Sequence, residues 1–517
     1  MKIERTKNAS RNVVFGTIRK AYQLIVPFFM RTVIVYLLGP GYAGLNNLFT
    51  SVLQVLNLAE LGVGSAMTFS MYKPIAEDDK DKICALMKLY RLYYRVIGIV
   101  VGIIGLSLLP FIPSLIKSDL PENVNVYVLY LMNLAATVLT YWLFSYRNCI
   151  LTAHQRIDVP HRIALVTDTI KYIVQVFVLF AFHDYYLYVL AILFTQVINN
   201  CTTAFMSAKL YPQYSPKGNL AKDEVRFING RIRDLFTSKL GGVILNSSDS
   251  IVVSAFLGLN MLTIYQNYYF IVSAIMGFVT IIFTSISAGI ANSLVTETLD
   301  KNFNDMKKLC FMISWISGFC CACFLAIMQP FMEIWMGKEL MQDIMFVVFF
   351  CMYFYILEIM TVINVYKDSA GLWHEDRFRP LASAFANLLM NVIMVQFWGL
   401  YGVILSTVLA VILVSMPWLL NNLFSLLFTR EQLKVFLKKN AKYLCIVVVV
   451  LAFNTFICSF VNLGLWGTVI IRLAICIIVP NVLFYLIYRR TDEFKQSVIL
   501  VDKMTKGRLH LSKVLGC

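Results

Sequence analysis

The sequence predicts an all-α polytopic membrane protein, because its composition and the spread of its apolar residues both differ from those of soluble domains. Of its 517 residues, 59% are hydrophobic and only 14% are charged, and the mean hydropathy is +0.72. Ordinary soluble domains are about a quarter charged. Apolar residues dominate along the whole chain, so the lipid bilayer is the expected environment. Aqueous enzymes, nucleic-acid-binding modules and disulfide scaffolds all fit this composition poorly.

Membrane-length apolar segments recur throughout the sequence. About 20 apolar residues cross the hydrocarbon as a helix, and on that basis we expect about 14 transmembrane helices. They lie near residues 13–38, 44–70, 88–112, 124–146, 161–182, 187–208, 234–257, 262–288, 309–328, 343–366, 381–398, 401–427, 442–461 and 466–488.

These segments predict two pseudo-symmetric six-helix lobes followed by a C-terminal helix pair. We expect an N-terminal lobe at 1–208, a cytoplasmic linker at 209–233 and a C-terminal lobe at 234–428. Residues 429–517 then hold the last two helices and a basic cytoplasmic tail.

The formal net charge of +16 indicates how the chain is oriented in the membrane. Lys and Arg collect in cytoplasmic loops of membrane proteins. One set of alternate loops contains Lys117 and Lys338 as its basic residues, whereas the other contains clusters at Lys209–Arg233 and Arg430–Lys442. This distribution predicts a multi-pass protein of the cytoplasmic membrane with both termini cytoplasmic, and it needs no nucleic-acid partner.

Catalytic and metal-binding motifs are missing from the sequence. It contains neither a G-x-x-x-x-G-K-[ST] phosphate loop nor an H-E-x-x-H pair, and its five histidines do not cluster. The acidic run Glu77–Asp81 is interleaved with lysine, which is typical of a solvated turn. We therefore expect no catalytic residue, no metal, no cofactor and no enzymatic activity. A membrane-embedded glycosyltransferase or polymerase would need a catalytic acid in a large loop, which this chain lacks.

Ionisable residues inside the predicted helices are the main functional signal, because charges in the hydrocarbon are costly and usually face a cavity or a partner helix. Arg31 lies well inside the first segment, and Lys20, Gln23 and Pro27 fall near it on the helical wheel. Shifting this segment by 219 residues places Lys20 on Lys239, Pro27 on Asn246, Arg31 on Ser250 and Gly39 on Gly258. The register indicates an internal repeat of the kind found in many transporters.

Further polar residues on other segments complete a predicted aqueous cavity. The expected cavity residues are Lys20, Gln23, Arg31, Asn57, Lys239, Asn246, Ser250 and Gln266. Candidate ion-coupling acids are Glu60, Asp168, Asp249 and Glu358, and Asp168 has Lys171 as a possible ion-pair partner on its own helix. Arg91 and Arg95, together with Tyr90, Tyr93 and Tyr94, are typical of an interfacial belt.

Three sequence blocks resemble the polysaccharide repeat-unit flippases of the multidrug/oligosaccharidyl-lipid/polysaccharide exporter superfamily. The first is LLGPGYAGLNNLFTSVLQVLNLAELGVGSAMTFSMYKPIAEDD (Leu37–Asp79). The second is NSSDSIVVSAFLGLNMLTIYQNYYFI (Asn246–Ile271), and the third is SAGLWHEDRFRPLASAFANLLMNV (Ser369–Val392), followed by GLYGVILST (Gly399–Thr407). The resemblance covers residues 10–430 in order.

The resemblance implies a flippase that works by alternating access. Its cargo would be an undecaprenyl-pyrophosphate-linked oligosaccharide, carried from the inner to the outer leaflet for cell-surface polysaccharide such as O-antigen or capsule. It also implies that Glu60–Leu61–Gly62 and Asp376–Arg377 are motif positions, the latter a gate or lobe contact. A polysaccharide polymerase and glycosyltransferases are the implied partners. A cation-coupled multidrug exporter and a peptidoglycan-precursor flippase of the same superfamily remain alternatives.

Overall fold

The computed structural model describes residues 5–117, 120–121 and 124–504, and their regular structure is helical throughout. The predicted all-α membrane fold class is thereby confirmed. By proximity of Cα atoms the chain divides into two compact units, Met1–Thr263 and Ile264–Cys517. The lobe boundaries expected from the sequence, 1–208 and 234–428, remain predictions.

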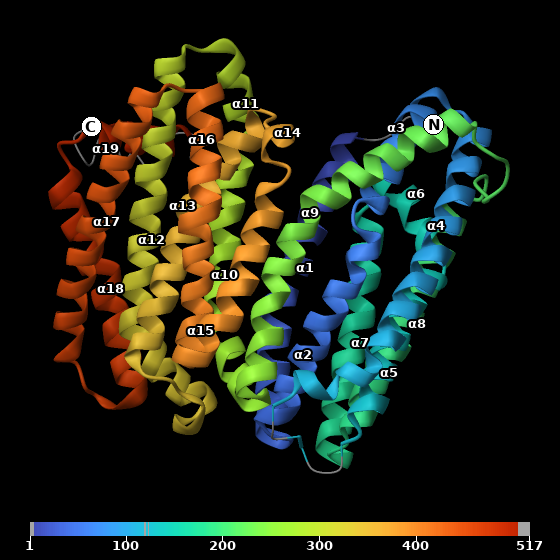
Figure 1. The fold of residues 1–517 in the computed structure, drawn as a ribbon, viewed down its shortest axis with the longest axis horizontal. Coiled ribbons are helices and arrows are strands. Elements are labelled where there is room, and N and C mark those ends of the chain that lie inside the picture. Colours follow the sequence, from blue (N-terminus) through green and yellow to red (C-terminus); the bar gives the residue numbers. More distant parts are fainter. Residues whose placement is uncertain (1–4, 118–119, 122–123, 505–517) are drawn as a thin grey trace. The chain divides into compact units, whose positions relative to one another are not determined.

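Unit 1 contains the helices from α1 to α9, coloured blue to green in Figure 1. Their bounds are α1 Arg5–Leu37, α2 Pro40–Leu56, α3 Val63–Glu77, α4 Lys80–Leu108, α5 Val126–Trp142, α6 Asn148–Ala153, α7 Asp158–Phe182, α8 Tyr185–Leu210 and α9 Lys222–Leu257. Short 3₁₀ turns are η1 Asn57–Glu60, η2 Leu109–Phe111, η3 Pro113–Leu115 and η4 Ser145–Arg147.

Unit 2 begins within α10 and contains the remaining helices. Their bounds are α10 Leu259–Ser285, α11 Ser287–Thr296, α12 Leu299–Met336, α13 Ile344–Ser369, α14 Trp373–Asp376, α15 Arg379–Ala410, α16 Met416–Leu426, α17 Arg430–Ser459, α18 Gly464–Tyr488 and α19 Asp492–Met504. A 3₁₀ turn, η5, spans Lys338–Leu340, and a π-helix, η6, spans Val411–Ser415.

Polar residues at the helix starts fix where several helices begin. The side chain of Asp79 accepts a hydrogen bond from the backbone N–H of Lys82, and the side chain of Asp343 accepts one from that of Phe346. Thr429 and Gln432 form a reciprocal capping box at the start of α17. Such caps satisfy backbone donors that a helix leaves free at its first turn.

Eleven helices of the described residues are long and apolar enough to cross a membrane, or twelve if α5 and the bent segment Ser145–Ala153 count as one crossing. The predicted number of 14 is not confirmed. Two features account for the difference. The segment at 44–70 is interrupted between α2 and α3, and the segments at 381–398 and 401–427 fall in one continuous stretch, Trp373–Leu426, which Gly399 bends.

The core of unit 2 is built around α12. This helix packs along α13, α17 and α18, and α13 also packs against α15 (Figure 1). Phe346, Phe350 and Phe354 follow one face of α13 and are fully buried. This face gives the helix a rigid aromatic attachment to its neighbours.

The predicted internal repeat has a counterpart in the backbone. Gly39 separates α1 from α2 with φ 105° and ψ 166°, and Gly258 separates α9 from α10 with φ 93° and ψ 174°. A positive φ with extended ψ is accessible essentially to glycine alone. The two glycines that the 219-residue shift aligns therefore make the same sharp turn between consecutive long helices.

Candidate functional site

Arg31 lies on α1, one turn after Pro27, and is only partly exposed. Its Nη2 donates a hydrogen bond of 3.2 Å to Oδ1 of Asn47 on α2. The Nδ2 of Asn47 is buried without a hydrogen-bond partner among the described residues. A guanidinium and a buried amide donor thus lie side by side, and both have the polarity that stabilises an oxyanion. Sequence reasoning missed Asn47, although it follows Arg31 by 16 residues across a tight helix-to-helix turn.

The other predicted cavity residues of α1 do not join this pair. Lys20 and Gln23 are exposed on unit 1. Eleven residues separate Lys20 from Arg31, which corresponds to about 16 Å along the helix axis. The basic face therefore extends along α1 without forming one compact cluster.

Asn57 and Glu60 are brought together by the break between α2 and α3. Asn57 starts the 3₁₀ turn η1, Glu60 ends it, and Gly62 follows with φ 86°. The hydroxyl of Tyr94 donates to Oε1 of Glu60 at 2.5 Å, and the hydroxyl of Tyr141 donates to Oδ1 of Asn57 at 2.7 Å. Interrupted helices in transporters expose polar backbone and side chains at the depth where cargo or ions bind.

The tyrosines of α4 correct one sequence interpretation. Tyr90 and Tyr94 are 3% and 6% exposed, and Tyr90 donates to the hydroxyl of Tyr94 at 2.8 Å. They are therefore interior residues that support Glu60, and assigning them to an interfacial belt was wrong. The reason is helical periodicity: positions 90 and 94 share one face of α4, while Arg91 and Arg95 share another.

Asp168 and Lys171 form an ion pair on α7. The Nζ of Lys171 lies 2.9 Å from Oδ1 of Asp168 and 4.2 Å from the ring centre of Tyr172. The expected pairing is therefore present, and it satisfies the carboxylate of this candidate ion-coupling residue.

The predicted residues of the seventh segment lie at different depths. On α9, Lys239 is exposed, whereas Asp249 and Ser250 are 7% and 2% exposed. The side chain of Asn246 lies outside the described residues. Gln266, on α10 in unit 2, is partly exposed.

Glu358 on α13 is the most deeply buried acid of the predicted set. Its side chain is fully buried, and neither carboxylate oxygen has a hydrogen-bond partner among the described residues. The hydroxyl of Ser317 on α12 is also buried and without a partner there. An isolated carboxylate in such surroundings is very unfavourable, so Glu358 is the acid of this set that would gain most from taking up a proton or a cation.

Asp376 is held in a buried network within unit 2. Its two carboxylate oxygens accept hydrogen bonds from Nε and Nη2 of Arg379 at 2.6 and 2.8 Å. Arg379 also reaches Asn364 on α13 and Ser415 in the π-helix, and Lys367 lies 3.4 Å from Asp376. The network ties three segments of unit 2 together.

Arg377, which the sequence paired with Asp376, points elsewhere. Its guanidinium is exposed and lies 3.3 Å from His374 and over the ring of Phe378. Arg379 is the residue that sequence reasoning missed. Its spacing of three from Asp376, at the start of a helix, was the available signal.

Two of the histidines have specific contacts within unit 1. His161 Nδ1 lies 2.8 Å from Nη1 of Arg19, which joins α7 to α1. The ring of His154 packs against Tyr211 and Tyr214, and burial lowers the pKa of His154 below its ordinary value. A neutral, enclosed imidazole of this kind serves packing.

Comparison with known proteins identifies neighbours in fold. Neither a scan against protein-family models nor a search of the curated proteins found a match. A solved structure described as lipid II flippase MurJ in the inward closed conformation matches with a TM-score of 0.66. The match covers 92% of this chain and 99% of that chain, at 16% identity. The chain shares the fold of this structure.

Two multidrug transporter structures extend the match. An inward-facing multidrug resistance MATE family transporter of the MOP superfamily matches with a TM-score of 0.52 and 14% identity, over 80% of this chain and 96% of that one. A structure of MATE in the bent conformation matches with a TM-score of 0.50 and 14% identity. That match covers 84% of this chain and 97% of that one. At these identities the likeness concerns the fold.

Proposed function

We propose that the chain is a flippase. It moves undecaprenyl-pyrophosphate-linked oligosaccharide repeat units from the inner to the outer leaflet of the bacterial cytoplasmic membrane by alternating access. Both termini are cytoplasmic, the bilayer and the lipid-linked glycan are its partners, and it changes no covalent bond. The proposal draws on the sequence blocks that resemble repeat-unit flippases and on the fold it shares with a flippase.

The observation that carries the proposal is the arrangement of Arg31 and Asn47. A positive charge inside a membrane helix is retained where it faces a polar partner or ligand. Here the Arg31 guanidinium lies beside the buried donor of Asn47. Guanidinium and amide donors match the oxygens of a pyrophosphate, because arginine offers several N–H groups in a fixed fork.

The glycan requires a polar route because each hydroxyl left without a partner in hydrocarbon costs several kcal/mol. Asn57 and Glu60 provide hydrogen-bonding groups at the break between α2 and α3. Lys239, Ser250 and Gln266 are the further residues that we propose for contact with the cargo. The polyprenyl chain needs no such route, because it is as apolar as the lipid.

Energy coupling is proposed to involve Glu358. Of the four candidate acids, Glu60 and Asp168 have donors on neighbouring side chains, and Asp249 has an interaction of its own. Glu358 is buried without a donor in the described residues. A proton or sodium ion would complete its environment and would be released when hydration changes during the cycle.

A second candidate function is the flipping of a peptidoglycan precursor. It is favoured by the higher TM-score of the lipid II flippase relative to the multidrug transporters. Both cargoes carry a polyprenyl pyrophosphate, so the Arg31 argument applies to either. A cation-coupled multidrug exporter is the third candidate, and the basic character of α1 disfavours it.

Depletion of the gene separates these candidates. Lipid-linked intermediates would be extracted from depleted cells, identified by mass and assigned to a membrane face by their accessibility to a membrane-impermeant glycosidase or oxidant. Inward-facing, completed repeat units together with loss of surface glycan support the proposal. Accumulation of a peptide-bearing precursor would favour the second candidate. Unchanged lipids with new sensitivity to cationic drugs would indicate an exporter.

Charge inversion at Arg31 tests the proposed pyrophosphate contact. Arg31→Glu should abolish transport while the protein is still inserted at normal levels, because a carboxylate repels the pyrophosphate. Arg490→Glu is the matched control, since Arg490 is exposed after the end of α18. Normal transport by the Arg31 variant would contradict the proposal.

A further inference from the structure

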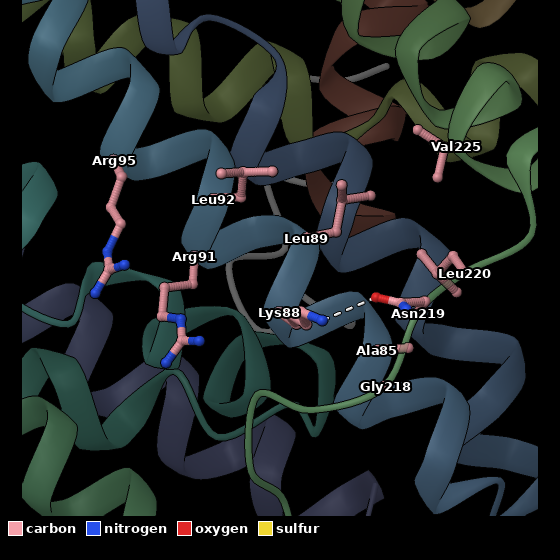
Figure 2. Close-up of a pocket in the computed structure, with 10 residues that line it drawn as sticks. All are labelled: Ala85, Lys88, Leu89, Arg91, Leu92, Arg95, Gly218, Asn219, Leu220 and Val225. Carbon is pink, nitrogen blue, oxygen red and sulfur yellow. Dashed lines mark hydrogen bonds between the residues drawn. The ribbon is translucent and has the colours of Figure 1, made fainter.

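A pocket within unit 1 lies outside the site described above. It is formed by the N-terminal half of α4 and the segment that leads into α9, and it has a volume of about 360 Å³ (Figure 2). Lys88 donates a hydrogen bond of 2.8 Å to Oδ1 of Asn219 across the pocket. Nearby, Tyr93 donates to Asn229 at 2.6 Å, so α4 and α9 are fixed to each other at this point.

The pocket is basic, and two of its charges have no partner among the described residues. Lys88, Arg91 and Arg95 line it from positions i, i+3 and i+7 of α4, which share one helix face. Figure 2 shows Arg91 and Arg95 extending from the helix in the same direction. In the part of the chain that the structure describes, neither guanidinium has a hydrogen bond or an ion pair. Lys82, one turn before the pocket, is by contrast paired with Glu224.

The pocket is also apolar, and its apolar surface continues along α4. Leu89, Leu92 and Leu220 contribute to its wall. Leu92, Val96, Ile99 and Ile103 are exposed large hydrophobic residues at helical spacing on the same helix. This row forms a stripe that begins at the pocket and runs toward the other end of α4.

The position of the pocket along α4 matches the level of lipid headgroups. About 20 residues of helix cross the hydrocarbon, and counting back from the end of α4 at Leu108 reaches the region of Lys88 and Leu89. Lys88 then lies at the interface, and Arg91 and Arg95 lie one to two turns further in, from where arginine side chains extend toward polar headgroups. The stripe lies within the hydrocarbon.

We propose that this pocket binds an anionic phospholipid of the membrane, with its phosphate on Arg91 and Arg95 and an acyl chain along the stripe. Lys88, already oriented by Asn219, supplies a third positive charge. A water-soluble phosphate would use the arginines alone, and it would leave the adjoining apolar stripe without a role. The stripe is the reason to assign a lipid.

The test is lipid binding to the full-length protein in detergent, measured by native mass spectrometry with dioleoylphosphatidylglycerol. The variant is Arg91→Gln combined with Arg95→Gln, and we expect affinity for this lipid to fall by about 25-fold, from about fivefold for each basic residue near an anionic headgroup. Arg489→Gln with Arg490→Gln is the matched control, since both residues are exposed after α18. The control pair should change affinity by less than about twofold.

Two further measurements separate recognition of this lipid from misfolding and from the binding of a water-soluble phosphate. Arg91→Lys with Arg95→Lys keeps both charges and should retain most of the binding, whereas a fold that depends on the arginines would lose it. Glycerol 1-phosphate at millimolar concentration should not displace the lipid. Displacement would identify a water-soluble phosphate as the occupant and overturn the assignment. Equal binding of dioleoylphosphatidylethanolamine, or equal loss in the control pair, would also overturn it.

Discussion

At the residue scale, the chain shows how a short sequence motif can mislead about which side chain carries a role. Asp376 and Arg377 are neighbours in sequence, yet the carboxylate of Asp376 is bound by Arg379. Asp376 ends α14 and Arg379 begins α15, and the two residues between them keep helical backbone angles, so side chains three positions apart meet and adjacent ones do not. The choice of partner matters for stability because both side chains are buried: Asp376 is 3% exposed and Arg379 is 9% exposed.

Removal of Arg379 should therefore be far more damaging than removal of Arg377. Breaking a buried ion pair by deleting one partner typically destabilises by about 3–5 kcal/mol, and Lys367 compensates part of that loss. We expect Arg379→Ala to lower the free energy of unfolding by about 3 kcal/mol. Arg377→Ala, at an exposed position, should change it by less than about 0.5 kcal/mol. Chemical unfolding in detergent micelles measures both, and equal effects would contradict the assigned network.

At the element scale, the break between α2 and α3 is the feature that positions Asn57 and Glu60. Gly62 allows it, because its φ of 86° and ψ of −22° lie in the left-handed region. A Cβ at this position would also approach the Cβ of Leu235 on α9 to 2.6 Å. Glycine is therefore required at this position for two reasons: its backbone is left-handed, and α9 approaches too closely for a Cβ.

Substitution of Gly62 should disturb the site as well as the stability. Left-handed backbone alone costs a non-glycine residue about 1–2 kcal/mol, and the contact with Leu235 forces α9 to shift. Gly62→Ala should thus destabilise by at least about 2 kcal/mol and reduce transport. Gly230→Ala is the control on α9, where a Cβ meets open space and a helical alanine is favourable. Unfolding measurements that rank the two variants in the opposite order would show that the break does not depend on Gly62.

The sequence predicted those structural elements that depend on one local property of the chain. Membrane length and apolar content placed the long helices, and the 219-residue shift paired Gly39 with Gly258, which adopt the same conformation. The contacts of Asn47, Tyr94 and Arg379 were not predictable in the same way. Each depends on which face of one helix meets another, and tertiary packing decides that.

At the scale of the whole molecule, the distribution of charge predicts which loops lie on each side of the membrane. In the predicted layout of 14 segments, basic residues are concentrated in one set of alternate loops, and the positive-inside rule predicts that these loops are cytoplasmic. An even number of crossings follows if both termini lie on that side. The helix count does not decide this number, because Gly62 and Gly399 interrupt regular helix inside predicted crossings.

Single cysteines in opposite loops test this topology directly. Lys338 lies in the short turn η5 with its side chain 81% exposed, and Lys217 lies in the exposed segment before α9. In intact cells, a membrane-impermeant maleimide should label Lys338→Cys above the background of the native cysteines. Lys217→Cys should react only after permeabilisation. Labelling of both sites in intact cells would contradict the prediction that these two loops lie on opposite sides of the membrane. The reverse pattern would place the basic loops outside, and Arg91 and Arg95 would then face the outer leaflet.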